Sequence, residues 1–189
     1  MPDTQMRRER LEIPAATARL IENGSDYIKA AAAALRVTDP QFLVSVARGS
    51  SDHVTTYLKY SSELLMGRVI ASIGPSIASV YNSPLSLSGS ACLSVSQSGK
   101  SPDIVAMARS AQSAGALSIA MTNNPQSPLS AVSDHTLNLH AGPEISVAAT
   151  KTFVNSAVTG IWLLAEWAGD DHLRRAIYAL PDVLDKAIH

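Results

Sequence analysis

The sequence predicts an α/β fold in which a five-stranded parallel sheet is covered by helices on both faces. From residue 41 onwards, short apolar segments alternate with longer segments of helical period, and this alternation is typical of parallel strands joined by crossover helices. The apolar segments are almost uninterrupted, as in strands that are buried on both faces. Of the 189 residues, 46% are apolar and 16% are charged, which suits one compact domain with a large core.

The chain is expected to have three parts: a helical segment over residues 1–40, the sheet with its helices over residues 41–170, and a helical segment over residues 171–189. Leu11, Ala15, Ala18 and Ile21 keep a period near 3.6, which predicts a helix over residues 1–36. Strands are expected at residues 42–47, 69–73, 91–95, 117–121 and 136–139. The helices between and after them are expected at residues 51–66, 75–81, 102–114 and 147–167.

The helix over residues 102–114 has the strongest end signals in the chain. Ser101 stands at the N-cap position, Pro102 at the first helical position, Asp103 in the first turn and Gly115 just past the end. These residue types at these positions favour a helix start and a helix stop.

Composition and charge exclude several classes of protein. The formal net charge is -1, so neither a nucleic acid nor an anionic membrane is an expected partner. The single cysteine, Cys92, lies in an apolar segment and is expected to be a core residue, which favours a reducing compartment. The segment of residues 153–167 is too short to span a bilayer, and no apolar region follows the N-terminal arginines. A cytoplasmic protein without a bound metal or cofactor is therefore expected.

Two loops rich in hydroxyl groups follow the first and third expected strands, at residues 48–52 and 94–101. Ligands of open parallel sheets bind beyond the carboxyl ends of the strands, where helix N-termini with unpaired N–H groups favour an anion. Gly49 and Gly99 allow a ligand to approach the backbone closely. The serines could instead serve only as helix caps, the role expected of Ser101, but they are more numerous than capping requires. Neither loop fits a nucleotide-binding motif, so the loops predict a phosphate site of another kind.

A third stretch, residues 142–151, leads from the fifth strand into the long helix. Glu144 could accept a hydrogen bond from a sugar hydroxyl or stabilise the N-terminus of that helix. Lys151 could balance a phosphate charge or be a solvated or paired residue. His53 follows the first serine loop, where a structural role is favoured over a role in the site.

The stretches 47–51 (ARGSS), 96–101 (SQSGKS) and 142–151 (GPEISVAATK) together resemble the signature motifs of sugar isomerase (SIS) domains. The resemblance covers nearly the whole chain and is greatest to the first SIS domain of glucosamine-6-phosphate synthase, in its isomerase half, and to SIS-type glucosamine-6-phosphate deaminases. It implies a flavodoxin-like three-layer sandwich. Lys100 stands where the synthase usually has Glu, which favours the deaminases. Ala149 stands where the synthase usually has Ser, which removes a hydroxyl from the sugar site.

The resemblance also implies a ligand and a function. The ligand would be glucosamine-6-phosphate or fructose-6-phosphate, and the chain would be the sugar-phosphate-binding half of an isomerase or deaminase that interconverts them. The alternative is a non-catalytic sugar-phosphate-sensing SIS domain of a regulator. The phosphate would be held by Ser51, Ser96, Gln97, Ser98 and Ser101. The sugar would be held by Gly49, Ser50, Glu144 and Val147.

The resemblance implies that catalysis and assembly need a second SIS domain. The catalytic base is expected there, so no catalytic residue is assigned in this chain, where Asp52, His53 and Glu144 are the titratable candidates. A homodimer or a partner SIS domain is expected. Trp162 and Trp167 lie in one apolar segment. A domain of this size has limited room to bury two tryptophan side chains, which also favours a dimer.

Overall fold

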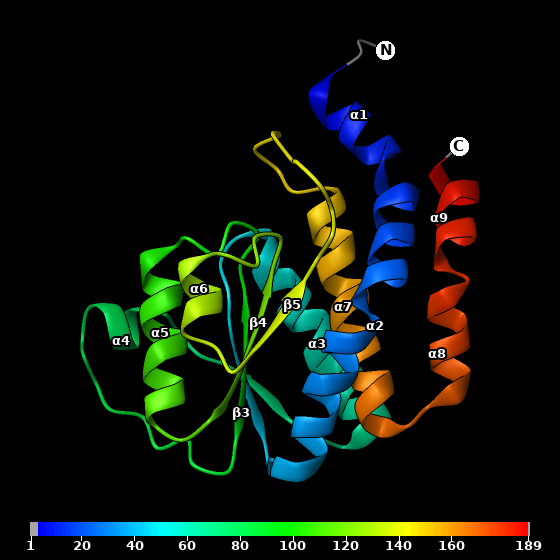
Figure 1. The fold of residues 1–189 in the computed structure, drawn as a ribbon. Helices are drawn as coiled ribbons and strands as arrows, with labels where there is room; N and C mark the ends of the chain where they lie inside the picture. The colour runs from blue at the N-terminus through cyan, green and yellow to red at the C-terminus, as the bar shows by residue number, and fades with distance from the viewer. Residues whose placement is uncertain (1–3, 189) are drawn as a thin grey trace.

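The computed structural model describes residues 4–188 and shows a three-layer α/β sandwich (Figure 1). Five parallel strands form one sheet in the order β2-β1-β3-β4-β5. The predicted fold class is confirmed, and each strand lies within about one residue of its predicted place. The strands are β1 (Leu43–Val46), β2 (Ile70–Ser72), β3 (Ala91–Val95), β4 (Leu117–Thr122) and β5 (His135–Asn138).

Helices cover both faces of this sheet. Figure 1 shows α2, α3 and α7 on one face and α4, α5 and α6 on the other, while α8 and α9 pack outside against α7 and α2. Within residues 4–188, no helix has the length and apolar character needed to cross a membrane. The helices are α1 (Gln5–Leu11), α2 (Ile13–Thr38), α3 (Ser50–Met66), α4 (Ser76–Ser79), α5 (Pro102–Ser113), α6 (Pro128–Ala131), α7 (Lys151–Ala168), α8 (Asp171–Tyr178) and α9 (Leu180–Ile188).

The strands supply side chains to two apolar clusters, one on each face of the sheet. Leu93 and Val95 of β3 pack on the side of α2, α3 and α7, whereas Cys92 between them packs on the side of α5. This alternation follows from the two-residue period of a strand. Cys92 is fully buried, as predicted, and burial raises the pKa of its thiol to about 11 although a hydrogen bond with Ser94 opposes the shift. A buried thiol of this kind is a core residue.

Both tryptophans of α7 are buried within a single chain. Trp162 is 0% exposed, its ring N–H donates to Glu166 Oε1 at 3.2 Å, and Tyr178 of α8 packs edge-on against its ring. Trp167 is 7% exposed. The inference that a domain of this size lacks room for both rings is therefore wrong, because α2, α3 and α8 enclose α7. Self-association stays a prediction that rests on the resemblance alone.

The predicted N-terminal helix is two helices within the described residues, and its predicted start at residues 1–3 lies outside them. The break falls at Glu12, which ends α1 and precedes α2. Pro14 explains the break, because a proline inside a continuous helix lacks the N–H donor and clashes with the preceding turn. The C-terminal segment divides in the same way near Pro181 into α8 and α9; its predicted end, residue 189, also lies outside the described residues.

Two further differences lie at the ligand-binding edge of the sheet. α7 begins at Lys151, four residues after its predicted start, because residues 142–150 form an ordered loop. α6 was not predicted, although Ser127 caps it and Pro128 opens it. The strand order reverses between β1 and β3, and a crevice forms at the carboxyl ends of strands on either side of such a point. The two serine loops follow these two strands.

Candidate functional site

A pocket of about 250 Å³ lies at the carboxyl ends of the strands, between the loops that follow β1, β3 and β5. The three predicted motifs, far apart in the sequence, meet around it. All the residues that the sequence assigned to phosphate and sugar line it: Gly49, Ser50, Ser51, Ser96, Gln97, Ser98, Ser101, Glu144 and Val147. Arg48, Ser146 and Ala149 line it as well.

Two helices start at this pocket without a side-chain cap. α3 follows Gly49, whose φ of +58° and ψ of -134° suit glycine alone. α5 follows Ser101, which occupies the N-cap position with an extended backbone, as expected, but its side chain makes no capping hydrogen bond. The Ser101 hydroxyl is thus available to a ligand, and the uncapped helix ends add their partial positive charge to the pocket.

The serine loop after β3 is stabilised by its own hydroxyls. The N–H of Gly99 donates to Ser96 Oγ at 3.2 Å, and the N–H of Lys100 donates to Ser98 Oγ at 3.3 Å. Gly99 has a φ of +63°, in the left-handed region that glycine adopts without strain. Both hydroxyls keep a proton that they can donate to an anion.

Backbone hydrogen bonds from the residue after β4 and from α6 hold this loop in place. The N–H of Asn123 donates to the Gln97 carbonyl at 3.0 Å, and the N–H of Leu129 donates to the Gly99 carbonyl at 3.1 Å. Sequence reasoning missed this support together with α6. The pair Ser127-Pro128, a cap followed by a proline at the first helical position, was the available signal.

Glu144 caps α7. Its Oε1 accepts hydrogen bonds from the N–H of Thr150 at 3.0 Å, from the Thr150 hydroxyl at 2.9 Å and from the N–H of Thr152 at 3.2 Å. Its Oε2 accepts a hydrogen bond from the Thr152 hydroxyl. Of the two roles considered for Glu144, the structure therefore shows the one at the helix N-terminus, although the residue also lines the pocket. A carboxylate held by these donors is poorly placed to remove a proton from a ligand.

The other titratable candidates lie outside the pocket. Lys151 is 1% exposed and pairs with Glu12, so the paired alternative is the observed one. His53 is exposed and does not line the pocket. Asp52 lines a neighbouring hollow beside α4. Among residues 4–188, no group of three or more His, Cys, Asp or Glu residues could hold a metal ion.

Arg48 is a pocket residue to which the sequence gave no role. Its guanidinium pairs with Asp103 Oδ2 at 3.0 Å and joins the loop after β1 to the first turn of α5. Because the Arg48 side chain is 68% exposed, this ion pair contributes little to stability. It does connect the first serine loop to the helix that follows the second one.

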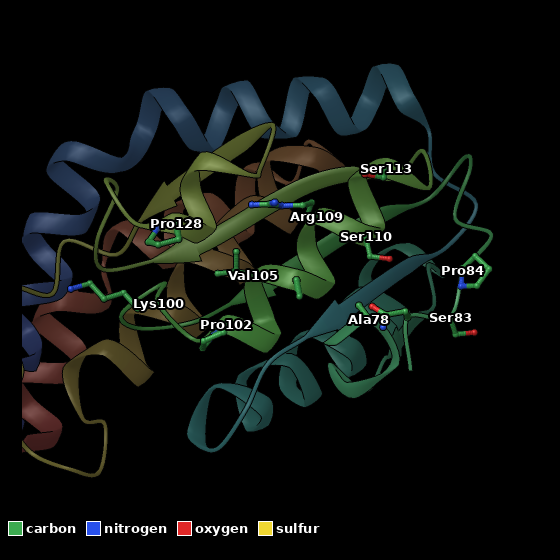
Figure 2. A pocket seen from close by; sticks show the side chains of 12 residues that line it. Ala78, Ser83, Pro84, Lys100, Pro102, Val105, Arg109, Ser110, Ser113 and Pro128 are labelled. Atoms are coloured by element: carbon green, nitrogen blue, oxygen red, sulfur yellow. The ribbon is translucent and has the colours of Figure 1, made fainter. Parts of the chain in front are cut away.

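A larger hollow of about 720 Å³ lies along the flank of α5 (Figure 2). Figure 2 shows Arg109 and Ser110 on α5, with Ser83 and Pro84 on the connection beyond α4. Lys100, one of the two departures from the synthase motif, lines this hollow and not the serine pocket.

Replacing Glu144 by alanine is expected to lower the free energy of unfolding by about 1–3 kcal/mol, since it removes the acceptor of several charge-assisted hydrogen bonds. Urea denaturation measures the change. Asp170→Ala is the matched control, because Asp170 caps α8 through one hydrogen bond, to the N–H of Leu173, and lies far along the chain from the pocket. A smaller loss for Glu144→Ala than for Asp170→Ala would contradict this role.

Comparisons with known proteins agree with this geometry. The family model described as "SIS domain" matches residues 38–165. A glutamine--fructose-6-phosphate aminotransferase [isomerizing] from Staphylococcus epidermidis is 32% identical over 176 residues, which cover 91% of this chain and 29% of that protein. The enzyme of the same name from Sulfurisphaera tokodaii is 33% identical over 129 residues, covering 68% of this chain and 21% of that protein.

Among solved structures, a candidate phosphosugar isomerase from Silicibacter pomeroyi DSS-3 superposes with a TM-score of 0.95 at 59% identity, over 98% of this chain and 57% of that one. This chain thus spans little more than half of that relative and less than a third of the two aminotransferases. The family model covers all five strands of the sheet, with the serine loops and the Glu144 loop inside the matched region. On these grounds the chain belongs to the SIS domain family.

Proposed function

We propose that this chain binds the phosphate of a sugar phosphate in the serine pocket, as the ligand-binding half of an amino-sugar-phosphate isomerase or deaminase. Glucosamine-6-phosphate and fructose-6-phosphate are the proposed ligands. One observation carries the proposal: serine hydroxyls from two loops and the uncapped N-termini of α3 and α5 converge on one pocket. The N-terminus of a helix binds anions through its unpaired backbone N–H groups and the helix dipole.

The chemistry of the pocket favours a phosphate over other ligands. With a net charge of -1, the chain has no general attraction for anions, so the dianion must be held by local donors. Hydroxyls and N–H groups supply several hydrogen bonds to the three oxygens of a phosphate. The pocket volume of about 250 Å³ is slightly below that of typical ligand pockets, which suits a phosphate with part of a hexose.

Catalysis is proposed to need a group from outside this chain. Isomerisation or deamination requires a base within hydrogen-bond reach of the proton that moves between C1 and C2. Glu144, the one titratable candidate at the pocket, is held by α7. We propose that a second SIS domain, in a longer chain or in a partner, supplies the base. The partial coverage of the aminotransferases and of the Silicibacter pomeroyi protein supports this.

A second candidate function is a sugar-phosphate sensor without catalysis. The capping role of Glu144 favours it, because a pocket whose carboxylate serves as a helix cap can bind a ligand without transforming it. The two functions differ in turnover and not in binding.

Calorimetry with phosphorylated and unphosphorylated sugars tests the shared part of the proposal. Glucosamine-6-phosphate or fructose-6-phosphate is expected to bind, whereas glucosamine and fructose at the same concentrations are not. Equal binding of glucosamine with and without its phosphate would disprove phosphate recognition. Turnover is then assayed for the chain alone and for the chain mixed with a second SIS domain. We expect activity in the mixture, and its absence there would favour the sensor.

A further inference from the structure

Glu9 is the buried residue of α1, a helix whose other residues are exposed. Its carboxylate reaches the loop between β5 and α7, more than a hundred residues away in the sequence. Oε1 accepts a hydrogen bond from the N–H of Ile145 at 2.6 Å, and the N–H of Ser146 donates to both carboxylate oxygens, at 3.3 and 3.1 Å. The side chain of Gln5 also donates to Oε1 at 3.1 Å. Figure 1 shows α1 and this loop at the same end of the molecule.

Burial of apolar side chains does not hold the middle of this loop. Ile145 is 76% exposed and Val147 is fully exposed, so neither adds the hydrophobic stabilisation that fixes most ordered segments. The two ends of the loop have other supports: the Gly142 carbonyl accepts a hydrogen bond from Asn123 Nδ2 at 2.8 Å, and Glu144 caps α7. Among the described residues, the hydrogen bonds to Glu9 are therefore the polar contacts that hold the middle of the loop beside the pocket.

The ionised form of Glu9 makes these contacts. Burial acts to raise the pKa of Glu9, but hydrogen bonds from Ser146, Ile145 and Gln5 outweigh it and lower that pKa to about 2. Because the folded-state pKa lies below the ordinary value for a glutamate, the stabilisation is fully present at neutral pH and is lost only as the pH falls towards 2. Two neighbouring backbone N–H groups that face one anion form a compact anion-binding arrangement.

A second contact fixes α1 relative to α7. Lys151, in the first turn of α7, is 1% exposed and pairs with Glu12 at the junction of α1 and α2. A buried ammonium needs such a partner. The end of α1 is thereby fixed against α7, and Glu9, one turn earlier in α1, is held at a set distance from the loop.

We propose that Glu9 is a positioning residue that sets the sugar-binding side of the pocket, separately from the phosphate side. The loop that it holds contributes Glu144, Ser146 and Val147 to the lining, whereas the serine loop after β3 is held by hydrogen bonds from Asn123, just after β4, and from Leu129 of α6. This inference rests on the proposed function, because it assigns the loop to the sugar of the same ligand. A general structural role would act on both sides of the pocket alike.

The test compares Glu9→Gln with wild type, and uses Glu22→Gln on the exposed face of α2 as the charge-matched control. Calorimetry measures the affinity of each variant for inorganic phosphate and for glucosamine-6-phosphate. Loss of the charge-assisted hydrogen bonds is expected to lower the affinity for glucosamine-6-phosphate by about tenfold or more, with phosphate affinity nearly unchanged. Amide exchange without ligand is expected to become faster at Ile145 and Ser146. Glu22→Gln is expected to change none of these.

Each other outcome overturns a defined part of the inference. A parallel loss of phosphate and sugar-phosphate affinity would mean that Glu9 acts through general stability. Unchanged exchange at Ile145 and Ser146 would show that Glu9 does not hold the loop. A wild-type chain that binds neither compound overturns the proposed function, and with it the sugar role of Glu9, while the exchange measurement still tests the contact itself. Glu9→Asp keeps the charge but shortens the side chain by one methylene group, and we expect faster exchange at Ile145 and Ser146 and weaker sugar-phosphate binding than in wild type; wild-type behaviour would show that the reach of the Glu9 side chain does not matter.

Discussion

Replacing Gly99 by alanine is expected to abolish measurable sugar-phosphate binding and to lower the free energy of unfolding by about 2–5 kcal/mol, the combined cost of left-handed backbone strain and overpacking. Gly99 has a φ of +63°, and a Cβ there would lie 2.1 Å from Ser127 Oγ and 2.5 Å from Ser127 Cβ. Ser127 is 1% exposed and its hydroxyl caps α6, so it cannot move aside without uncapping that helix. The serine loop must move instead, and with it Ser98 and Ser101.

Gly67→Ala is the matched control for this change. Gly67 ends α3 with a φ of +65°, nearly the same as Gly99, but a Cβ there would meet nothing within 4 Å. It should cost only the backbone strain, about 1–2 kcal/mol, and leave ligand affinity unchanged. Urea denaturation and calorimetry measure both effects. If the two alanine variants are equally destabilised and both still bind ligand, the close contact with Ser127 does not shape the loop.

The double variant Gly99→Ala with Ser127→Gly tests the cause directly. Removing the Ser127 side chain gives the new Cβ room, and a glycine N-cap costs only a few tenths of a kcal/mol relative to serine. We expect the double variant to be more stable than Gly99→Ala alone and to recover part of the affinity. No recovery would assign the whole effect to backbone strain at residue 99.

The features that the sequence predicted well are those with a local cause. The strands follow from short apolar segments, and α5 follows from Ser101, Pro102, Asp103 and Gly115, which act within one or two turns. The serine loops could be brought to one pocket from the sequence, because parallel strands end at one edge of their sheet. All the predicted pocket residues lie there for this reason.

The features that the sequence did not predict depend on contacts between distant segments. Glu9 meets Ile145 and Ser146 across 136 and 137 residues, and Lys151 meets Glu12 across 139. An isolated glutamate on an N-terminal helix carries no local signal that it is buried, since most glutamates are exposed. Burial of Trp162 and Trp167 likewise depends on how α2, α3 and α8 pack around α7. Ser101 differs again: its position matches a cap, but its side chain does not make the bond.

Replacing Ser98 by alanine is expected to weaken sugar-phosphate binding by about 1.5–3 kcal/mol, the contribution of one hydrogen bond to a charged group. That corresponds to roughly a 10- to 150-fold loss of affinity. Within the protein, Ser98 Oγ accepts one long bond, from the N–H of Lys100 at 3.3 Å, so its removal should change stability little. Calorimetry measures the affinity. Ser110→Ala is the control, because Ser110 lines the hollow on α5 and not the serine pocket.

The pattern across ligands separates Ser98 from Glu9. If Ser98 holds the phosphate, Ser98→Ala should weaken the binding of inorganic phosphate and of glucosamine-6-phosphate by the same factor. The lost hydrogen bond belongs to the phosphate group, which both compounds share. Glu9→Gln should weaken only the binding of the sugar phosphate and leave the binding of inorganic phosphate unchanged. Additive losses in the double variant are expected because Ser98 and Glu9 have no hydrogen-bond partner in common. A Ser98→Ala variant that loses sugar-phosphate affinity but keeps its phosphate affinity would place Ser98 at the sugar, and the phosphate would then have to be held by the N-terminus of α3 and Ser51.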